Sequence, residues 1–365
     1  ELDASVGDFA RAKTGAEGSL TMLRAAAAQI GETPEMAADI ADAELRLGAL
    51  ELDANQPSSA RRRFREAIGR YEALSVTETS EPHWRAVLSD AWALAAEADY
   101  ARGAPDAARD AMDRSLQARL RLAARDPRES WALAGTWRVR AALRAALGDN
   151  TAAAESMTQA RSLAEQLCAP NRSAETPARF LVHTLLDQVD HALRAGELAV
   201  AREAANEARA QAERFASAQD ANAAWLADAS ACWDRIGEIA RAGRQSPLDA
   251  FARAAEMRRM AYERARDDTR QARGFAAALL KQGDAALEAN ENATARAVFN
   301  ESAAIRLALM EAKPDDRVAA HALALRSSDS ALRRRRLAIS MRRAARGKMS
   351  LRWPSASLSP MTLRA

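Results

Sequence analysis

Residues 41–74 read ADAELRLGALELDANQPSSARRRFREAIGRYEAL, and this stretch decides the fold class. Gly48 is followed by Ala60, Phe64 and Ala67 at spacings that suit two antiparallel helices packed side by side. We expect the small Gly48 to lie where the helices cross, while the later residues fill the facing groove. The stretch therefore predicts one helical hairpin of two amphipathic helices, each about 20 residues long.

The same pattern returns five times along the chain, so tandem repeats are predicted. Its copies carry Trp92, Ala96, Ala108 and Met112; Trp137, Ala141, Ala153, Met157 and Ala160; Ala201, Ala205 and Ala208; Trp233, Gly237, Phe251 and Ala254; and Gly283, Ala295, Phe299 and Ser302. The predicted helix crossings at positions 48, 96, 141, 188, 237 and 283 lie 45 to 49 residues apart. Gly-rich and Pro-containing turns separate the segments, as helix ends require. The predicted fold is all-α: a right-handed α-α superhelix, or solenoid, of tandem hairpins.

The repeats set the expected domain boundaries. A partial N-terminal repeat or cap is expected at 1–34, and six hairpins at about 35–78, 79–126, 127–170, 171–218, 219–266 and 267–312. A degenerate seventh repeat is expected to start at 313–332. A basic tail at 333–365 is predicted to be disordered.

Charge is divided unevenly along the chain. Residues 1–330 hold 43 basic and 50 acidic side chains, whereas the segment from Ala331 onward holds ten basic side chains and no acidic one. Eight of these ten are predicted to form the basic tail site: Arg333, Arg334, Arg335, Arg336, Arg342, Arg343, Arg346 and Lys348. Such a segment could bind nucleic acid or an anionic membrane through phosphates. A disordered end, or a frame-shifted one, explains the abrupt loss of the repeat better.

The hairpin pattern resembles the tetratricopeptide repeat family over roughly residues 35–312, in a long-helix variant with a period near 47 rather than 34. A narrower resemblance links residues 7–26 and 287–316 to repeats appended to bacterial serine/threonine kinases. The first resemblance implies a protein-binding scaffold. The second implies the regulatory region of a signalling kinase or transcription regulator whose catalytic part lies upstream.

No enzymatic site is predicted. The chain has no Gly-rich phosphate loop, no GxSxG elbow and no kinase signature. His83, His183, His191 and His321 are predicted to be ordinary surface or turn residues, and Cys168 and Cys232 lack metal-ligand spacing. The acid pair at Asp267-Asp268 is interpreted as a helix cap. We expect no cofactor and no metal.

Tryptophans pair within the first helices of hairpins: Trp84 with Trp92, Trp131 with Trp137, and Trp225 with Trp233. They could form an aromatic cage for a cation. Because they recur at a fixed phase of the repeat, we interpret them as packing residues between hairpins.

The resemblance implies that the first helix of each hairpin lines the concave face, which holds the partner. Its exposed positions map here onto Asp42, Asp90, Glu97, Tyr100, Arg138, Asp234, Glu238 and Arg241. These residues predict a groove of mixed charge with an acidic excess, suited to an extended or helical segment carrying Arg or Lys. A merely solvated face is the alternative. The family's Lys/Asn clamp for a peptide carboxylate has no counterpart at these positions.

The expected partner is a protein or peptide, and self-association through the terminal helices is also possible. No apolar run approaches the about 18 residues that span a bilayer. A cytoplasmic protein is expected, with an extracytoplasmic domain of a membrane-anchored kinase as the alternative.

Overall fold

The computed structural model describes residues 9–76, 82–171, 174–217 and 222–312. The predictions for the seventh repeat at 313–332, the basic tail and His321 lie outside these residues. The helices are α2 (Phe9–Ile30), α3 (Pro34–Asp53), α4 (Pro57–Leu74), α5 (Pro82–Ala101), α6 (Pro105–Ala123), α7 (Ser130–Ala146), α8 (Asn150–Cys168), α9 (Glu175–Ala195), α10 (Leu198–Ala216), α11 (Ala223–Ala242), α12 (Leu248–Arg264), α13 (Thr269–Glu288) and α14 (Asn292–Ala312). Two short 3-10 helices, η1 (Pro127–Glu129) and η2 (Ala169–Asn171), precede α7 and follow α8.

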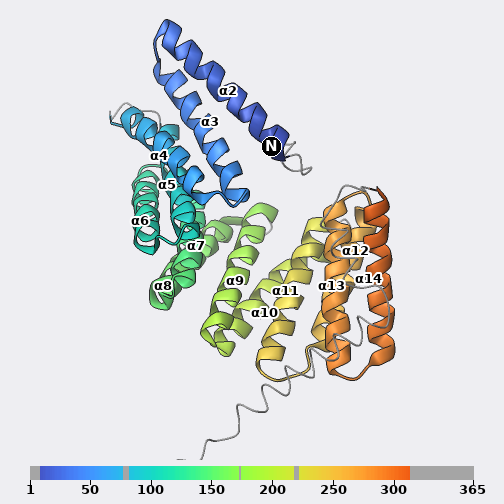
Figure 1. The fold of residues 1–365 in the computed structure, drawn as a ribbon. Coiled ribbons are helices and arrows are strands. Elements are labelled where there is room, and N and C mark those ends of the chain that lie inside the picture. The colour runs from blue at the N-terminus through green and yellow to red at the C-terminus, as the bar shows by residue number, and fades with distance from the viewer. Residues whose placement is uncertain (1–8, 77–81, 172–173, 218–221, 313–365) are drawn as a thin grey trace, which may run out of the picture. The chain divides into compact units, whose positions relative to one another are not determined.

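The chain forms two compact units, unit 1 (residues 1–211) and unit 2 (residues 212–365). In unit 1 each helix from α2 to α8 packs on the next, up to α9, and in unit 2 the same holds from α11 to α14 (Figure 1). The described part of the chain contains no strand. The prediction of an all-α array of helical hairpins is confirmed.

First and second helices play different roles in the array. We call α3, α5, α7, α9, α11 and α13 first helices, and the even-numbered helices second helices. Consecutive first helices touch one another, in the pairs α3–α5, α5–α7, α7–α9 and α11–α13. Among the described residues, consecutive second helices make no comparable contact. The first helices therefore line the inner side of each unit.

Glycine lies at the helix crossings in three hairpins. A Cβ added at Gly237 would lie 2.5 Å from Cε1 of Phe251, and additions at Gly48 and Gly283 would come at least as close to Phe64 and Phe299. Real Cβ atoms essentially never come so near another heavy atom. The predicted crossing positions 48, 237 and 283 are therefore confirmed, because each ring occupies the space that a side chain would need.

The other crossings follow the same rule with different residues. Ala96 and Ala141 are each 1 % exposed, and the matching second-helix residues Met112 and Met157 are also buried. In α9 the prediction is off by one residue: Gln188 is half-buried, whereas Val189 is fully buried. Val189 lies 48 residues before Gly237, and the second-helix position paired with it holds Ala205. A larger residue on one helix thus accompanies a smaller one on the other.

Turn and cap residues account for where the helices end. Gly103, Gly148 and Gly196 adopt φ of 75°, 80° and 79°, a left-handed conformation that glycine tolerates without strain. The Asp268 carboxylate accepts a hydrogen bond from the backbone N–H of Arg270 and caps α13. Its predicted role as a cap is confirmed. The Arg270 side chain also donates to the Asp268 carboxylate, and this bond, followed by the backbone one, lowers the pKa of the Asp268 carboxyl.

The tryptophans pack as predicted. Trp225 is 1 % exposed and stacks on Phe215 with ring centroids 4.3 Å apart. Trp131 meets the Phe180 ring edge-on at 5.3 Å, and Trp84 and Trp92 pack against the core formed by α3 to α7. Within the described ranges, no helix combines the length and the apolar character needed to cross a bilayer.

Candidate partner-binding surface

A hollow of unit 1 lies between α2 and α3. This α2–α3 groove has a volume of about 750 Å³. Apolar atoms of Ala12, Ala16, Leu23, Ala43 and Leu50 line it, together with the charged side chains of Arg11, Asp39, Asp42, Arg46 and Asp53. Three carboxylates thus face two guanidinium groups. An apolar lining with charges of both signs suits an amphipathic protein segment.

Packing and ion pairs fix α2 beside α3. Leu20 is buried against Ile40, Ala43 and Leu47 of α3. On another side of α2, Arg24 bonds the fully buried Glu44 of α3 and, at 2.8 Å, Glu66 of α4. Together these contacts set the width of the groove.

Glu44 is the most deeply buried charge in this region. Arg63 of α4 donates to its carboxylate at 3.1 Å, in addition to the bond from Arg24. Burial raises the pKa of Glu44, although both arginines oppose the shift. Its carboxylate therefore depends on these two donors to remain charged inside the protein.

Two of the predicted groove residues, Asp42 and Asp90, bond to second helices of their own hairpins. The Tyr71 hydroxyl donates to Asp42 at 2.6 Å and lies 3.3 Å from the Ala38 carbonyl oxygen. Arg119 donates in the same way to Asp90 at 2.5 Å and to the Ala86 carbonyl at 3.2 Å. These equivalent contacts, 48 residues apart, tie first helix to second helix. Asp42 also faces the α2–α3 groove.

Glu97, Tyr100 and Arg138 lie on first helices of unit 1. Glu97 is exposed and Tyr100 is 44 % exposed, both on α5. Arg138 of α7 instead pairs with Asp187 of α9 at 2.6 Å, and its guanidinium lies over the Phe180 ring. Glu97 and Tyr100 thus present accessible side chains, whereas Arg138 links two first helices.

The structure brings the remaining three predicted residues together in unit 2. Asp234 pairs with Lys281 of α13 at 3.2 Å, and Glu238 lies 3.9 Å from the same ammonium group. Arg241 pairs with Glu238 at 3.2 Å and with Glu288 of α13 at 3.5 Å. Neighbouring first helices thus neutralise much of the charge that the sequence seemed to offer to a partner.

The sequence prediction missed four charged groove residues, Arg11 of α2 and Asp39, Arg46 and Asp53 of α3. Residues 1–34 were predicted to be a partial N-terminal repeat or cap, and no groove residue was assigned to them. A signal was nevertheless present: Ala12, Ala16, Ser19 and Leu23 lie 48 residues before Ala60, Phe64, Ala67 and Tyr71. The predicted tail residues, from Arg333 to Lys348, lie outside the described part of the chain.

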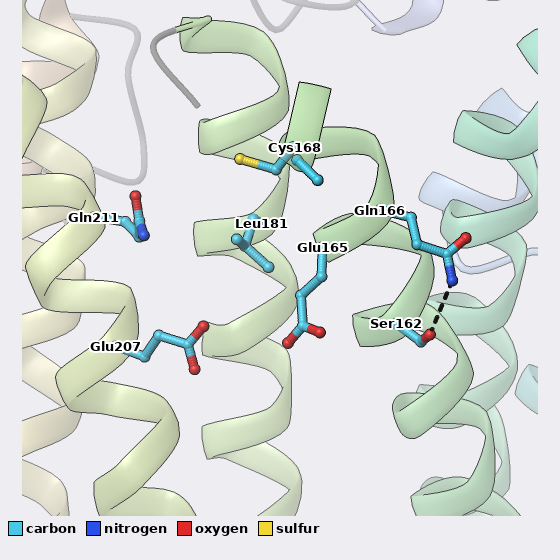
Figure 2. A pocket seen from close by; sticks show the side chains of 8 residues that line it. Ser162, Glu165, Gln166, Cys168, Leu181, Glu207 and Gln211 are labelled. Atoms are coloured by element: carbon cyan, nitrogen blue, oxygen red, sulfur yellow. Dashed lines mark hydrogen bonds between the residues drawn. The ribbon is translucent and has the colours of Figure 1, made fainter. Parts of the chain in front are cut away.

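A second pocket, of about 530 Å³, lies between α8, α9 and α10 of unit 1. Figure 2 shows Glu165 of α8 and Glu207 of α10 on its opposite sides, with Leu181 of α9 behind them. Arg161 bonds both carboxylates at 2.7 Å. Because one arginine already neutralises part of this acidic pair, the pocket offers a weaker site than the α2–α3 groove.

His191 was predicted to be a surface or turn residue, and this is wrong. It is 7 % exposed and lines a pocket of about 120 Å³ with Arg138, Asp187, Asp190 and Arg194. Burial lowers the pKa of His191, and the positive charge of Arg194 lowers it further. His191 lies on the buried side of α9, two residues after Val189. The predicted crossing at position 188 did not identify this side of the helix.

We expect the stability of unit 1 to fall as the pH drops below about 6.5, the pKa of an unfolded histidine. The unfolded chain then binds a proton at His191 that the folded chain, with its lowered pKa, does not. Urea midpoints at about pH 7.5 and about pH 5.5 measure the effect. His191→Gln should show a smaller difference between the two midpoints. The exposed His83→Gln control should match the wild type, and an equal loss in the His191 variant would contradict the assignment.

Neither a metal nor a reactive thiol site is evident in the described ranges. No three His, Cys, Asp or Glu side chains gather there as a metal-ligand set. Cys168 and Cys232 are buried and form no disulfide.

No protein-family model matches the sequence, and neither does any curated protein. Among solved structures, BtubC from P. vanneervenii is similar with a TM-score of 0.50 and 15 % identity, over 71 % of this chain and 91 % of that chain. The fold is a tetratricopeptide-like helical array. The nuclear import adaptor Nro1 of S. pombe has a TM-score of 0.48 and 11 % identity, over 84 % of this chain and 100 % of its own. At such identities the likeness concerns the fold alone.

Proposed function

We propose that this chain is a protein-binding module that holds a segment of a partner protein in the α2–α3 groove and along the inner side of unit 1. The observation that carries the proposal is the groove itself, an open hollow of about 750 Å³ with an apolar lining and charged residues. Such surfaces gain affinity from apolar burial and specificity from charge. The proposed role is binding, without catalysis.

The residues around the groove specify the chemistry of the partner. Asp39, Asp42 and Asp53 outnumber Arg11 and Arg46, so a segment with one more basic than acidic side chain fits best. The exposed Glu97 and Tyr100 extend the inner face on α5. An aromatic ring beside a carboxylate also favours a partner that presents Arg or Lys.

Site-specific photo-cross-linking in the source cells tests the proposal. A photoreactive phenylalanine analogue at Ser19 or Arg46, which line the groove, should capture the same partner. An analogue at Leu120, an exposed position on the second helix α6, should not.

Gly15→Leu should abolish the cross-linked product, because it fills a groove position where an added side chain meets nothing within 4 Å. Gly69→Leu is the matched control, since Gly69 of α4 is equally free of neighbours and lies outside this groove. Capture that is equal at Leu120, or that survives Gly15→Leu, would refute the groove as the binding site.

A further inference from the structure

Helix α2 has the register of a second helix. Shifted by 48 residues, Ala12, Ala16, Ser19 and Leu23 fall on Ala60, Phe64, Ala67 and Tyr71 of α4, and these fall in turn on Ala108, Met112, Ser115 and Arg119 of α6. The adjoining positions Leu20, Ile68 and Leu116 are 4 %, 4 % and 7 % exposed. Leu20 packs on α3, the following first helix, so the register of α2 agrees with its packing.

The four equivalent positions have different environments in the three helices. In α4 and α6 all of them are at most 3 % exposed. Phe64, the best-defined example, lies against Gly48 of α3, the first helix of its own hairpin. In α2, Ala12, Ala16, Ser19 and Leu23 line the open α2–α3 groove instead. The groove therefore occupies the place where α2 would meet a first helix.

We infer that the α2–α3 groove receives an amphipathic α-helix of a partner protein, packed antiparallel to α2 and in contact with the inner stripe of α3. The inference rests on the proposed binding function and adds the form of the bound segment. The equivalent surfaces of α4 and α6 are each covered by a helix, because α3 packs on α4 and α5 packs on α6.

The residue sizes at the helix crossings indicate how large the side chain at the centre of the partner helix must be. Gly48 faces Phe64, Ala96 is paired with Met112 in the register, and Val189 with Ala205. The second-helix position is Ala16 in α2, which is as small as Ala205. Close packing therefore requires a side chain of at least valine size on the partner helix, where glycine would leave a void.

The face of α3 specifies the flank of the partner helix. At the positions where α5 carries Val87 and Leu94, packed against the core, α3 carries Asp39 and Arg46 in the groove. A first helix of this chain would find apolar neighbours there, whereas the partner helix meets two opposite charges. It thus carries a basic residue near Asp39 and an acidic residue near Arg46.

Two peptides serve as probes in a binding experiment. The first has the sequence of α9, residues 175–195, with Val189 at the crossing, and the second is identical except for Val189→Gly. Fluorescence anisotropy against the whole chain should show that the valine peptide binds wild type at least about tenfold more tightly. Ala16→Phe should reverse this preference, because it recreates the Phe–Gly pairing seen at Phe64 and Gly48.

Gly15→Leu should abolish binding of the valine peptide, and Gly69→Leu should leave it unchanged. Equal affinities for the two peptides in wild type and Ala16→Phe, or no binding at all, would overturn the helix inference. The cross-linking result at Ser19 would still decide the proposed function separately. Sedimentation velocity tests whether a second copy of this chain occupies the groove instead. Self-association that Gly15→Leu abolishes would assign the groove to that second copy and overturn the partner assignment.

Discussion

Replacing Gly48 with alanine is expected to destabilise unit 1 by about 2–3 kcal/mol. The added Cβ would lie within 3.0 Å of three ring atoms of Phe64, a ring that is fully buried. Alanine favours helix by up to about 1 kcal/mol over glycine, so the clash has to exceed this gain. Urea unfolding followed by circular dichroism measures the change.

A double substitution separates size matching from a general disturbance of the hairpin. Ala96 and Met112 occupy the equivalent positions of the next hairpin. Gly48→Ala with Phe64→Met should therefore be within about 1 kcal/mol of wild type, with a coupling free energy above about 1.5 kcal/mol. Gly69→Ala, in open space on α4, should be neutral or stabilising. Additive losses in the double variant would contradict the size rule.

Replacing Glu44 with alanine should destabilise unit 1 by about 3 kcal/mol. Glu44 is fully buried between α2, α3 and α4, and its loss leaves the largely buried Arg63 without this acceptor. It also removes the bond between Arg24 of α2 and Glu44 of α3, so the α2–α3 groove should lose its shape. Urea unfolding gives the stability, and faster amide hydrogen exchange in α2 should report the loosened helix.

Glu66→Ala is the matched control for Glu44→Ala. Glu66 bonds the same Arg24, at 2.8 Å, but its side chain is 41 % exposed. An exposed ion pair contributes less than about 1 kcal/mol, so this variant should unfold close to wild type and keep α2 protected. Equal effects of the two substitutions would show that the buried carboxylate of Glu44 does not fix α2 beside α3.

Much of the fold could be predicted because its cause is local and repeats. Gly48, Gly237 and Gly283 each precede a phenylalanine by 14 to 16 residues. This recurring spacing indicates two closely packed helices in each hairpin. The position in α9 was missed by one residue because the spacing of the crossings varies. A valine at the crossing also lacks the small-residue signal, although it is compatible with Ala205 on the second-helix side.

The candidate site was harder to predict because it depends on which charges find partners. Residue type alone placed Asp42 and Asp90 on the first helices, but the donors Tyr71 and Arg119, 29 residues later, determine their bonds. The pairing of Asp234 with Lys281 likewise joins two hairpins. The α2–α3 groove escaped prediction because Ala16 replaces the phenylalanine or methionine that marks a second helix.

The most direct test of whether the α2–α3 groove binds a helix is hydrogen exchange of the whole chain, measured with and without the α9-derived valine peptide. Slower exchange confined to α2 and α3, and lost in Gly15→Leu, is the result expected. Slowing on α11 and α13 instead, or none anywhere, would contradict it.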